Sequence, residues 1–342
     1  MPDQVDVSPW VLTLVAAALV ACVLVWYVIL VRCLHKKPIL KFEPRSPVPW
    51  GAGASLLALT IVLIAAVNFV SGAEQPNLDG ISPLEMAEEI AKSAFLMLLI
   101  TSVAVILVGA TSGASWRDFG LPGKVSGFIR DGKFGVLGWL STMIPVYGIQ
   151  ALLIHQFKQP SNHPLLKMLL QEPTPILIIA GFLMAVIVAP ICEELAFRLF
   201  LQGSLEKWEA TRVAANSTSP DANIRSDAQE VTDAKLISTS LSNSETLVAP
   251  KPTFLLTTKP PQGGWGLPYG WVPIGVSSFL FAFAHLGHGP DPVAIFFLAI
   301  ILGYTYHQTH RIIPCIVTHM LFNGWSMGML LTQILHQSGA GS

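Results

Sequence analysis

Charged residues are scarce in this chain of 342 residues, because Asp, Glu, Lys and Arg together make up only 12% of it. Soluble domains carry about 25% of such residues. Apolar residues account for 52%, and the mean hydropathy is +0.58. The formal net charge is −1, so no basic surface points to a nucleic-acid partner. We therefore predict an all-α fold, a polytopic integral membrane helix bundle in the cell (cytoplasmic) membrane.

Several chemical signatures are also missing from the sequence. No HExxH motif occurs, which disfavours the site-2 type of zinc protease. Neither the Gly-x-Ser-Gly of rhomboid proteases nor the Gly-x-Gly-Asp of presenilins is present. No CxxC pair occurs, and three of the four cysteines lie in or directly after apolar runs, so we expect free buried thiols. The cysteines are Cys22, Cys33, Cys192 and Cys315.

Eight apolar runs predict about eight transmembrane helices. Basic residues follow the first run, so the positive-inside rule places residues 32–49 in the cytoplasm and both termini outside. The acidic segment 71–92 is expected to be an outer loop. The sixth and seventh runs are short for a span and need tilt or local thinning of the bilayer. The runs cover residues 10–31, 52–70, 95–110, 134–154, 176–191, 271–284, 293–306 and 312–335.

Composition divides the chain into four parts. Residues 1–110 hold N-terminal transmembrane helices, and residues 111–210 hold the first part of a candidate core. Within that part, residues 111–133 are expected to lie at the membrane interface. Residues 211–268 are rich in Ser, Thr, Asn, Asp and Pro, which predicts a disordered polar insertion. Residues 269–336 hold the second part of the core.

Two adjacent carboxylates and an arginine end the fifth apolar run. Ionisable groups at membrane depth cost about 2.5–3.5 kcal/mol each on insertion scales, so they mark a candidate functional site. Glu194 and Arg198 are four residues apart, and we expect an ion pair between them on one helix face. Glu193 points about a quarter-circle away and has no such local partner. Glu193 is therefore the strongest candidate for chemistry.

Three further polar residues stand inside the late apolar runs. His285 ends the sixth run, and His319 and Asn323 share one face of the last. A free carboxylate and a histidine can remove a proton from water, while a second histidine and an amide can donate to an oxyanion. This set predicts amide hydrolysis without a covalent intermediate. Alternatively, Glu193, His285 and His319 could bind Zn²⁺ with water in the fourth position.

Three motifs in chain order resemble those of the CAAX-prenyl-endoprotease and bacteriocin-processing (CPBP, or Abi) family of intramembrane proteases. The resemblance covers roughly residues 130–335, apart from the insertion. The motifs are Glu193-Glu194-x-x-x-Arg198, Phe281-x-x-x-His285 and His319-x-x-x-Asn323.

The resemblance implies a role for each matching residue. Family members are described both as metalloproteases and as metal-independent glutamate proteases, so the cofactor is either none or zinc. We favour the metal-free mechanism, because Asn323 completes an oxyanion site that zinc would make partly redundant. The resemblance assigns water activation to Glu193 and His285, oxyanion stabilisation to His319 and Asn323, and support of the site to Glu194 and Arg198.

The expected partners are the lipid bilayer and a peptide or lipidated protein substrate. Two alternatives stay open: a non-enzymatic immunity or scaffold protein of the same fold, and a proton- or cation-coupled transporter. No inverted repeat supports the transporter. Phe281 is expected to be a packing residue, and the remaining histidines, including His307 and His310, are assigned no role. By rise per residue, Glu193 lies nearer the cytoplasmic edge than His319 and His285, so the mechanism requires tilted helices.

Overall fold

The fold is taken from a computed structural model, in which residues 9–57, 60, 82–158, 164–217, 267–286 and 291–339 are described. Within these ranges the chain folds into helices joined by loops, so the predicted all-α class is confirmed. Five helices are long and apolar enough to cross a membrane. They are α1 (Pro9–Leu34), α3 (Pro83–Ser112), α4 (Val125–Phe157), the continuous helix Pro175–Ala215 and α11 (Asp291–Thr309).

The remaining predicted spans have different outcomes. Helix α10 (Trp271–Phe283) is apolar but shorter than the five long helices. The last run forms α12 (Ile312–Gly339), whose length fits a span by residue count. Most of the second run, 52–70, lies outside the described residues. The total of eight spans therefore stays a prediction.

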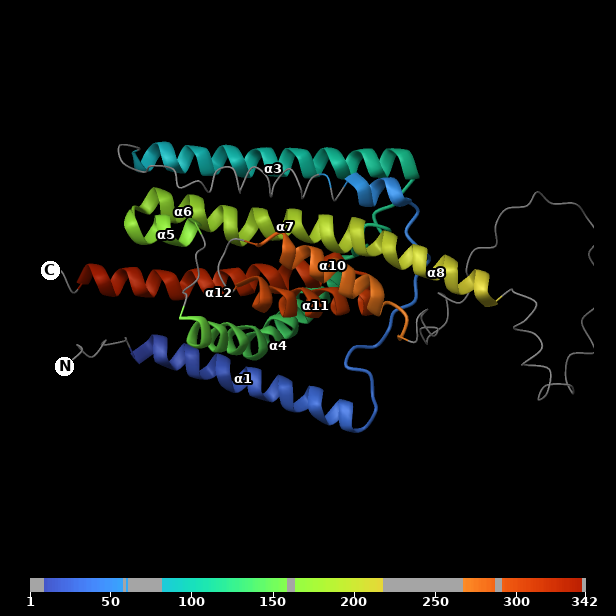
Figure 1. Ribbon diagram of the computed structural model, residues 1–342, viewed down its shortest axis with the longest axis horizontal. Helices are drawn as coiled ribbons and strands as arrows, with labels where there is room; N and C mark the ends of the chain where they lie inside the picture. Colours follow the sequence, from blue (N-terminus) through green and yellow to red (C-terminus); the bar gives the residue numbers. More distant parts are fainter. Residues whose placement is uncertain are drawn as a thin grey trace, which may run out of the picture.

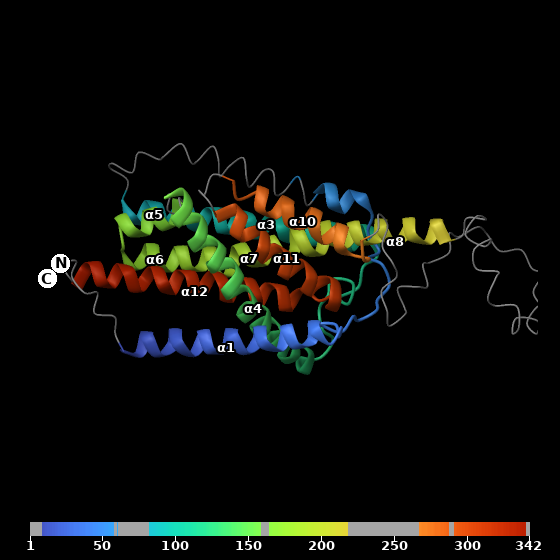
Figure 2. The same cartoon turned by 60° about the horizontal axis from the view of Figure 1, so that its bottom comes forward.

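The helices form an elongated bundle (Figures 1 and 2). Helix α12 packs against α4 and the middle of the long helix, α10 packs against α11, and α1 packs on α4. Helix α1 begins and α12 ends at the same end of the bundle (Figure 1), in agreement with termini on one side. Large apolar side chains such as Leu24, Ile106 and Leu152 face outward. Apolar surface on this scale fits lipid, so the helices indicate a multi-pass membrane protein.

The predicted outer loop 71–92 is wrong from Pro83 onward, because α3 begins there. Ser82 caps this helix: its hydroxyl accepts from the Glu85 N–H at 3.3 Å, and its own N–H donates to Glu85 Oε2 at 2.8 Å. This reciprocal pair is a capping box, which satisfies two backbone donors of the first turn. Glu85, Glu88 and Glu89 of this segment therefore lie on a helix.

Two further boundaries differ from the sequence prediction. The expected interfacial segment 111–133 is divided, because α4 begins at Val125 and continues through Pro145. A short helix, α5 (Pro164–Gln171), precedes the long one. The long helix itself runs to Ser217, so the first residues of the predicted insertion 211–268 are helical. Residues 218–266 of that insertion lie outside the described residues.

The long helix contains two stretches of π-helix on either side of a short α-helical segment. Each π-turn takes up more residues than an α-turn, so the stretches change which side chains face the bundle interior. Such turns are frequent at functional sites. In chain order the segments are α6 (Pro175–Phe182), η1 (Leu183–Val188), α7 (Ala189–Glu194), η2 (Leu195–Gln202) and α8 (Gly203–Ser217).

Candidate functional site

The end of α7 meets α12 inside the bundle, where Glu194 and His319 are hydrogen-bonded. Glu194 Oε1 lies 2.9 Å from His319 Nδ1 across 125 positions of sequence. The Glu194 carboxylate can only accept when it is ionised, so Nδ1 of His319 carries the proton in this bond. The other ring nitrogen, Nε2, then points toward Glu193, whose Oε2 is 3.8 Å away. Glu193 and His319 thus lie close to one another.

The 3.8 Å gap between Glu193 and His319 is too long for a direct hydrogen bond. A polar separation of this size can be bridged by a water molecule that contacts both groups. Glu193 keeps 22% of its side chain exposed, whereas His319 keeps 4%. The pair therefore joins a more accessible carboxylate to a buried, oriented imidazole.

The predicted ion pair between Glu194 and Arg198 is confirmed. Arg198 Nε lies 3.2 Å from Glu194 Oε2, and both side chains are fully buried. Arg198 Nη1 also donates to Ser277 Oγ at 2.9 Å, and Ser277 in turn donates to the Phe197 carbonyl at 3.0 Å. A buried ion pair needs such additional bonds to offset the desolvation of its charges. Arg198 therefore compensates Glu194, which in turn orients His319.

His285 reaches the same region through Phe281. The two rings have centroids 4.9 Å apart, and Phe281 also contacts the His319 ring at 5.7 Å. His285 Nδ1 donates to the Phe281 carbonyl at 2.8 Å, which leaves Nε2 with the lone pair in the neutral ring. The Arg198 guanidinium carbon lies 5.2 Å from the centre of the Phe281 ring. Phe281 is thus a packing residue, as predicted, and its ring contacts both histidines.

Asn323 bonds a neighbouring helix, as a polar side chain inside an apolar run can do in place of a catalytic role. Its amide donates to the Ala185 carbonyl in η1 at 2.8 Å. At the end of η1 the Ala189 N–H donates to the Met184 carbonyl, five residues earlier, as in a π-helix. The next bond of this pattern would join the N–H of residue 190 to the Ala185 carbonyl. Residue 190 is Pro190, which has no N–H, and Asn323 satisfies the carbonyl instead. One amide N–H of Asn323 is therefore used in helix packing, and its second N–H is the one available for chemistry.

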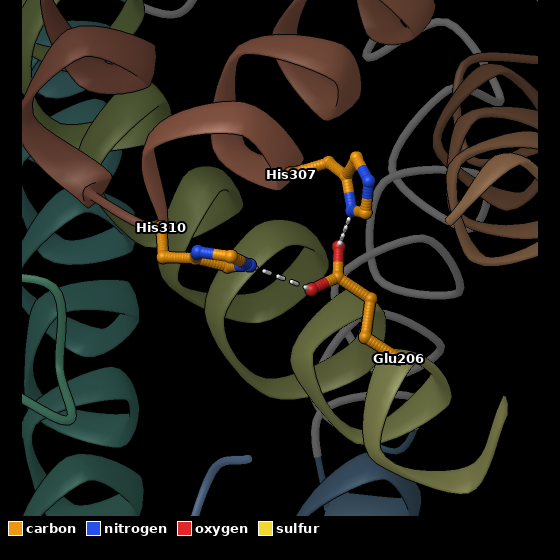
Figure 3. A group of neighbouring side chains, drawn as sticks. All are labelled: Glu206, His307 and His310. Carbon is orange, nitrogen blue, oxygen red and sulfur yellow. Dashed lines mark hydrogen bonds and ion pairs between the residues drawn. The ribbon is translucent and has the colours of Figure 1, made fainter. Parts of the chain in front are cut away.

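The described residues do not assemble the predicted zinc ligands. Their metal-binding atoms form one group of three within 4.8 Å, and it is not Glu193, His285 and His319. Because Glu193, His285 and His319 do not fit a metal site as they are placed, no step of the chemistry is derived through zinc there. The group that does form is Glu206, His307 and His310, all of which are buried (Figure 3).

The cluster of Glu206, His307 and His310 is consistent with a catalytic site in its residue types, yet sequence reasoning gave it no role. Its members come from α8, from the end of α11 and from the turn before α12. The only local signal was the spacing of the two histidines, three residues apart at the end of an apolar run. Nothing in the sequence placed Glu206 beside them.

The fold and the buried Glu–Arg–His arrangement define a helical membrane protein with ionised groups inside its bundle, a combination typical of functional sites in membranes. Residues 175–219 and 255–325 match the family model for the Rce1-like type II CAAX prenyl endopeptidases. These two segments are therefore similar to a family of proteases. The matched segments cover about a third of the chain and include every site residue discussed above. No curated protein and no solved structure matches the chain.

Proposed function

We propose that the chain is an intramembrane endopeptidase that hydrolyses a peptide bond of a membrane-associated or prenylated peptide, with Glu193 as the base. The observation that carries this proposal is the arrangement of Glu193 and His319 around a gap of 3.8 Å. The Arg198–Glu194 ion pair fixes the His319 ring, and the similarity of two segments to the family model supports peptide hydrolysis as the reaction.

The chemistry begins with a water molecule held between Glu193 and the histidines. Glu193 accepts one proton from this water, and the water oxygen attacks the carbonyl carbon of the scissile bond. The carbonyl oxygen takes the negative charge in the tetrahedral intermediate. The intermediate collapses, the C–N bond breaks, and the leaving nitrogen takes the proton that Glu193 accepted. Both products leave without a covalent bond to the protein.

Orientation of the imidazole decides what His319 contributes. With Nδ1–H donated to Glu194, His319 can donate from Nε2 only as imidazolium, and a carboxylate on Nδ1 stabilises that charged form. His319 then acts as an oxyanion donor, as the family resemblance implies. The second N–H of Asn323 is a further donor one helical turn away.

His285 is the other candidate for handling the water proton. Its Nδ1 is occupied by the Phe281 carbonyl, so its Nε2 is the nitrogen that can accept. A neutral imidazole that shares the water with Glu193 would increase the driving force for removing its proton. Water activation is therefore assigned to Glu193 and His285 together.

The test uses purified full-length protein in lipid nanodiscs, with a farnesylated CAAX-type peptide and the same peptide without its lipid. Mass spectrometry of the products reports both cleavage and its position. We expect a single cut in the farnesylated peptide, retained after dialysis against a chelator. If neither peptide is cut and the protein instead moves protons or cations across liposome membranes, the transporter alternative replaces this proposal.

A further inference from the structure

The buried cluster of Glu206, His307 and His310 has a geometry that hydrogen bonding alone does not explain. Glu206 Oε1 lies 3.2 Å from His307 Nδ1, and Glu206 Oε2 lies 3.5 Å from His310 Nε2 (Figure 3). The second distance is beyond the usual 2.7–3.2 Å of an N–H···O bond, that is, about 0.3 Å too long. The three side chains are at most 7% exposed, so bulk water does not separate them.

The hydrogen bond made by His310 Nδ1 indicates whether Nε2, the nitrogen that faces Glu206, carries a proton. His310 Nδ1 lies 2.8 Å from the carbonyl oxygen of Glu43, which can only accept, so Nδ1 carries a proton. In the neutral ring, Nε2 then presents a lone pair to the lone pairs of Glu206. Metal-binding histidines show this same pattern, in which the other ring N–H donates to a backbone carbonyl. Two acceptors that face each other without a proton between them repel, and a cation bound to both Nε2 and the carboxylate would remove this repulsion.

The separations also fit a metal ion. Zinc bonds to histidine nitrogen and carboxylate oxygen are about 2.0–2.2 Å, so neighbouring ligands of a tetrahedral site lie about 3.3–3.5 Å apart. The two Glu206–histidine distances, 3.2 and 3.5 Å, bracket that spacing. Two histidines and one carboxylate are a common zinc ligand set.

His307 is held in place by a glycine with a special backbone. Gly270 has φ +88°, in the left-handed region, and any Cβ on it would overlap the His307 ring. The ring also packs against Phe42 and Tyr269, with centroids 5.6 Å away in each case. The position of His307 toward Glu206 is therefore fixed by its surroundings, as a ligand position requires.

A second carboxyl group lies next to the cluster, and one of its two oxygens has no hydrogen-bond partner among the described residues. Glu209 is 4% exposed, and its Oε2 accepts from the Gly270 N–H at 2.8 Å. Its Oε1 is buried and has no hydrogen-bond partner among the described residues. Glu206 and Glu209 bring two carboxyl groups to this interior, and Arg45 lies close enough to act on the buried Tyr269 and His310 side chains. Unpaired buried charge is costly, and a divalent cation would offset it.

We propose that Glu206, His307 and His310 bind one divalent transition-metal ion of the zinc class. The ion fastens α8 to the end of α11 and to the turn before α12. Through the His310–Glu43 bond it also fastens the segment that follows α1. Glu193 lies thirteen positions before Glu206 on the same continuous helix, with the whole of η2 between them, and the two sites share no residue. The site is therefore separate from the proposed hydrolytic site and does not depend on it.

The experiment measures metal binding by full-length, tag-free protein in detergent after treatment with a chelator. Co²⁺ and Zn²⁺ are the probes, with bound metal counted by mass spectrometry and four-coordinate Co²⁺ detected by its visible absorption. We expect one ion per chain in the wild type and a rise in Tm on adding Zn²⁺. Glu206→Gln should weaken binding by at least about 100-fold, because even outer-shell changes cost about 10–100-fold. The matched variant Glu193→Gln should bind one ion as the wild type does.

The Glu193→Gln protein locates the ion even if Glu206→Gln does not fold. Loss of the ion in Glu193→Gln places the metal at the Glu193 site and overturns the proposal. Two other results also overturn it: wild-type protein that binds no added Co²⁺ or Zn²⁺, and binding that neither substitution changes. The Tm readout is independent of peptide cleavage, so failure of the hydrolytic proposal leaves this result unaffected.

Discussion

Glu194 and His319 are joined by a 2.9 Å hydrogen bond although 125 positions separate them in the chain. The bond ties the first motif of the family resemblance to the third. It also defines which nitrogen of His319 faces Glu193. The adjacent carboxylates thus have different tasks: Glu194 orients the ring inside a buried ion pair, and Glu193 remains the more exposed group.

Replacing Glu194 with Gln should impair catalysis more than substrate binding. The amide can donate as well as accept, so it no longer fixes the tautomer of His319 or stabilises its charged form. In the serine-protease triad the equivalent change lowers kcat by about 10⁴-fold, and we expect a loss of at least about 10²-fold here. Steady-state kinetics should show kcat falling with little change in KM. A rise in KM at unchanged kcat would contradict the orienting role.

Replacing Arg198 with Met should destabilise the fold, because it leaves the Glu194 carboxylate buried without its cation. Removing one partner of a buried ion pair costs about 3–5 kcal/mol. Unfolding titrations in detergent should show this loss of unfolding free energy. The double variant Arg198→Met with Glu194→Gln should recover part of it, since it removes both charges. Strictly additive losses in the double variant would mean that the two residues do not interact.

Replacing Gly270 with Ala should lower stability, whereas the same change at Gly275 should not. Gly270 has φ +88° and its added methyl group would overlap the His307 ring. Strained backbone of this kind costs about 1–3 kcal/mol. Gly275 lies within α10 and has open space around it, so alanine there should be neutral or stabilising by up to about 1 kcal/mol. Equal Tm values for the two variants would refute the close contact between Gly270 and His307.

Stability of the metal-free protein should fall in acid. Burial of the His310 ring, with Arg45 nearby, lowers its pKa to about 4. The unfolded histidine has a pKa of about 6.5, so between these values the unfolded chain binds more protons than the folded one. The free energy of unfolding should therefore decrease as pH falls from about 6.5 to about 4, by about 3 kcal/mol. Unfolding measured against pH checks this, with His310→Gln showing a flatter curve; parallel curves would contradict it.

The helices were predictable wherever long apolar runs dominate. The ion pair between Glu194 and Arg198 followed from their four-residue spacing alone, because helix geometry is local. The start of α3 was missed although Ser82 and Glu85 form a recognisable capping box in the sequence. The many acidic residues of this segment suggested a loop, and that composition was given more weight than the helix-capping pattern of Ser82 and Glu85.

Tertiary features were not predictable in the same way. The bond between Asn323 and Ala185 depends on a π-turn in η1, and no side-chain periodicity encodes that turn. The cluster around Glu206 depends on three elements that meet only in the folded bundle. Sequence spacing shows which residues share a helix face, but it does not show which faces meet.

The central claim, that Glu193 is the base for peptide hydrolysis, is tested most directly by the rate of cleavage of a verified substrate by Glu193→Gln protein. Glu89→Gln is the matched control, because Glu89 is an exposed carboxylate on α3 whose ion pair with Lys92 lies at the surface. General-base catalysis contributes about 10²–10⁴-fold, so Glu193→Gln should be slower by at least about 10²-fold while Glu89→Gln keeps the wild-type rate. A folded Glu193→Gln protein that cleaves as fast as the wild type would contradict the mechanism proposed for this site.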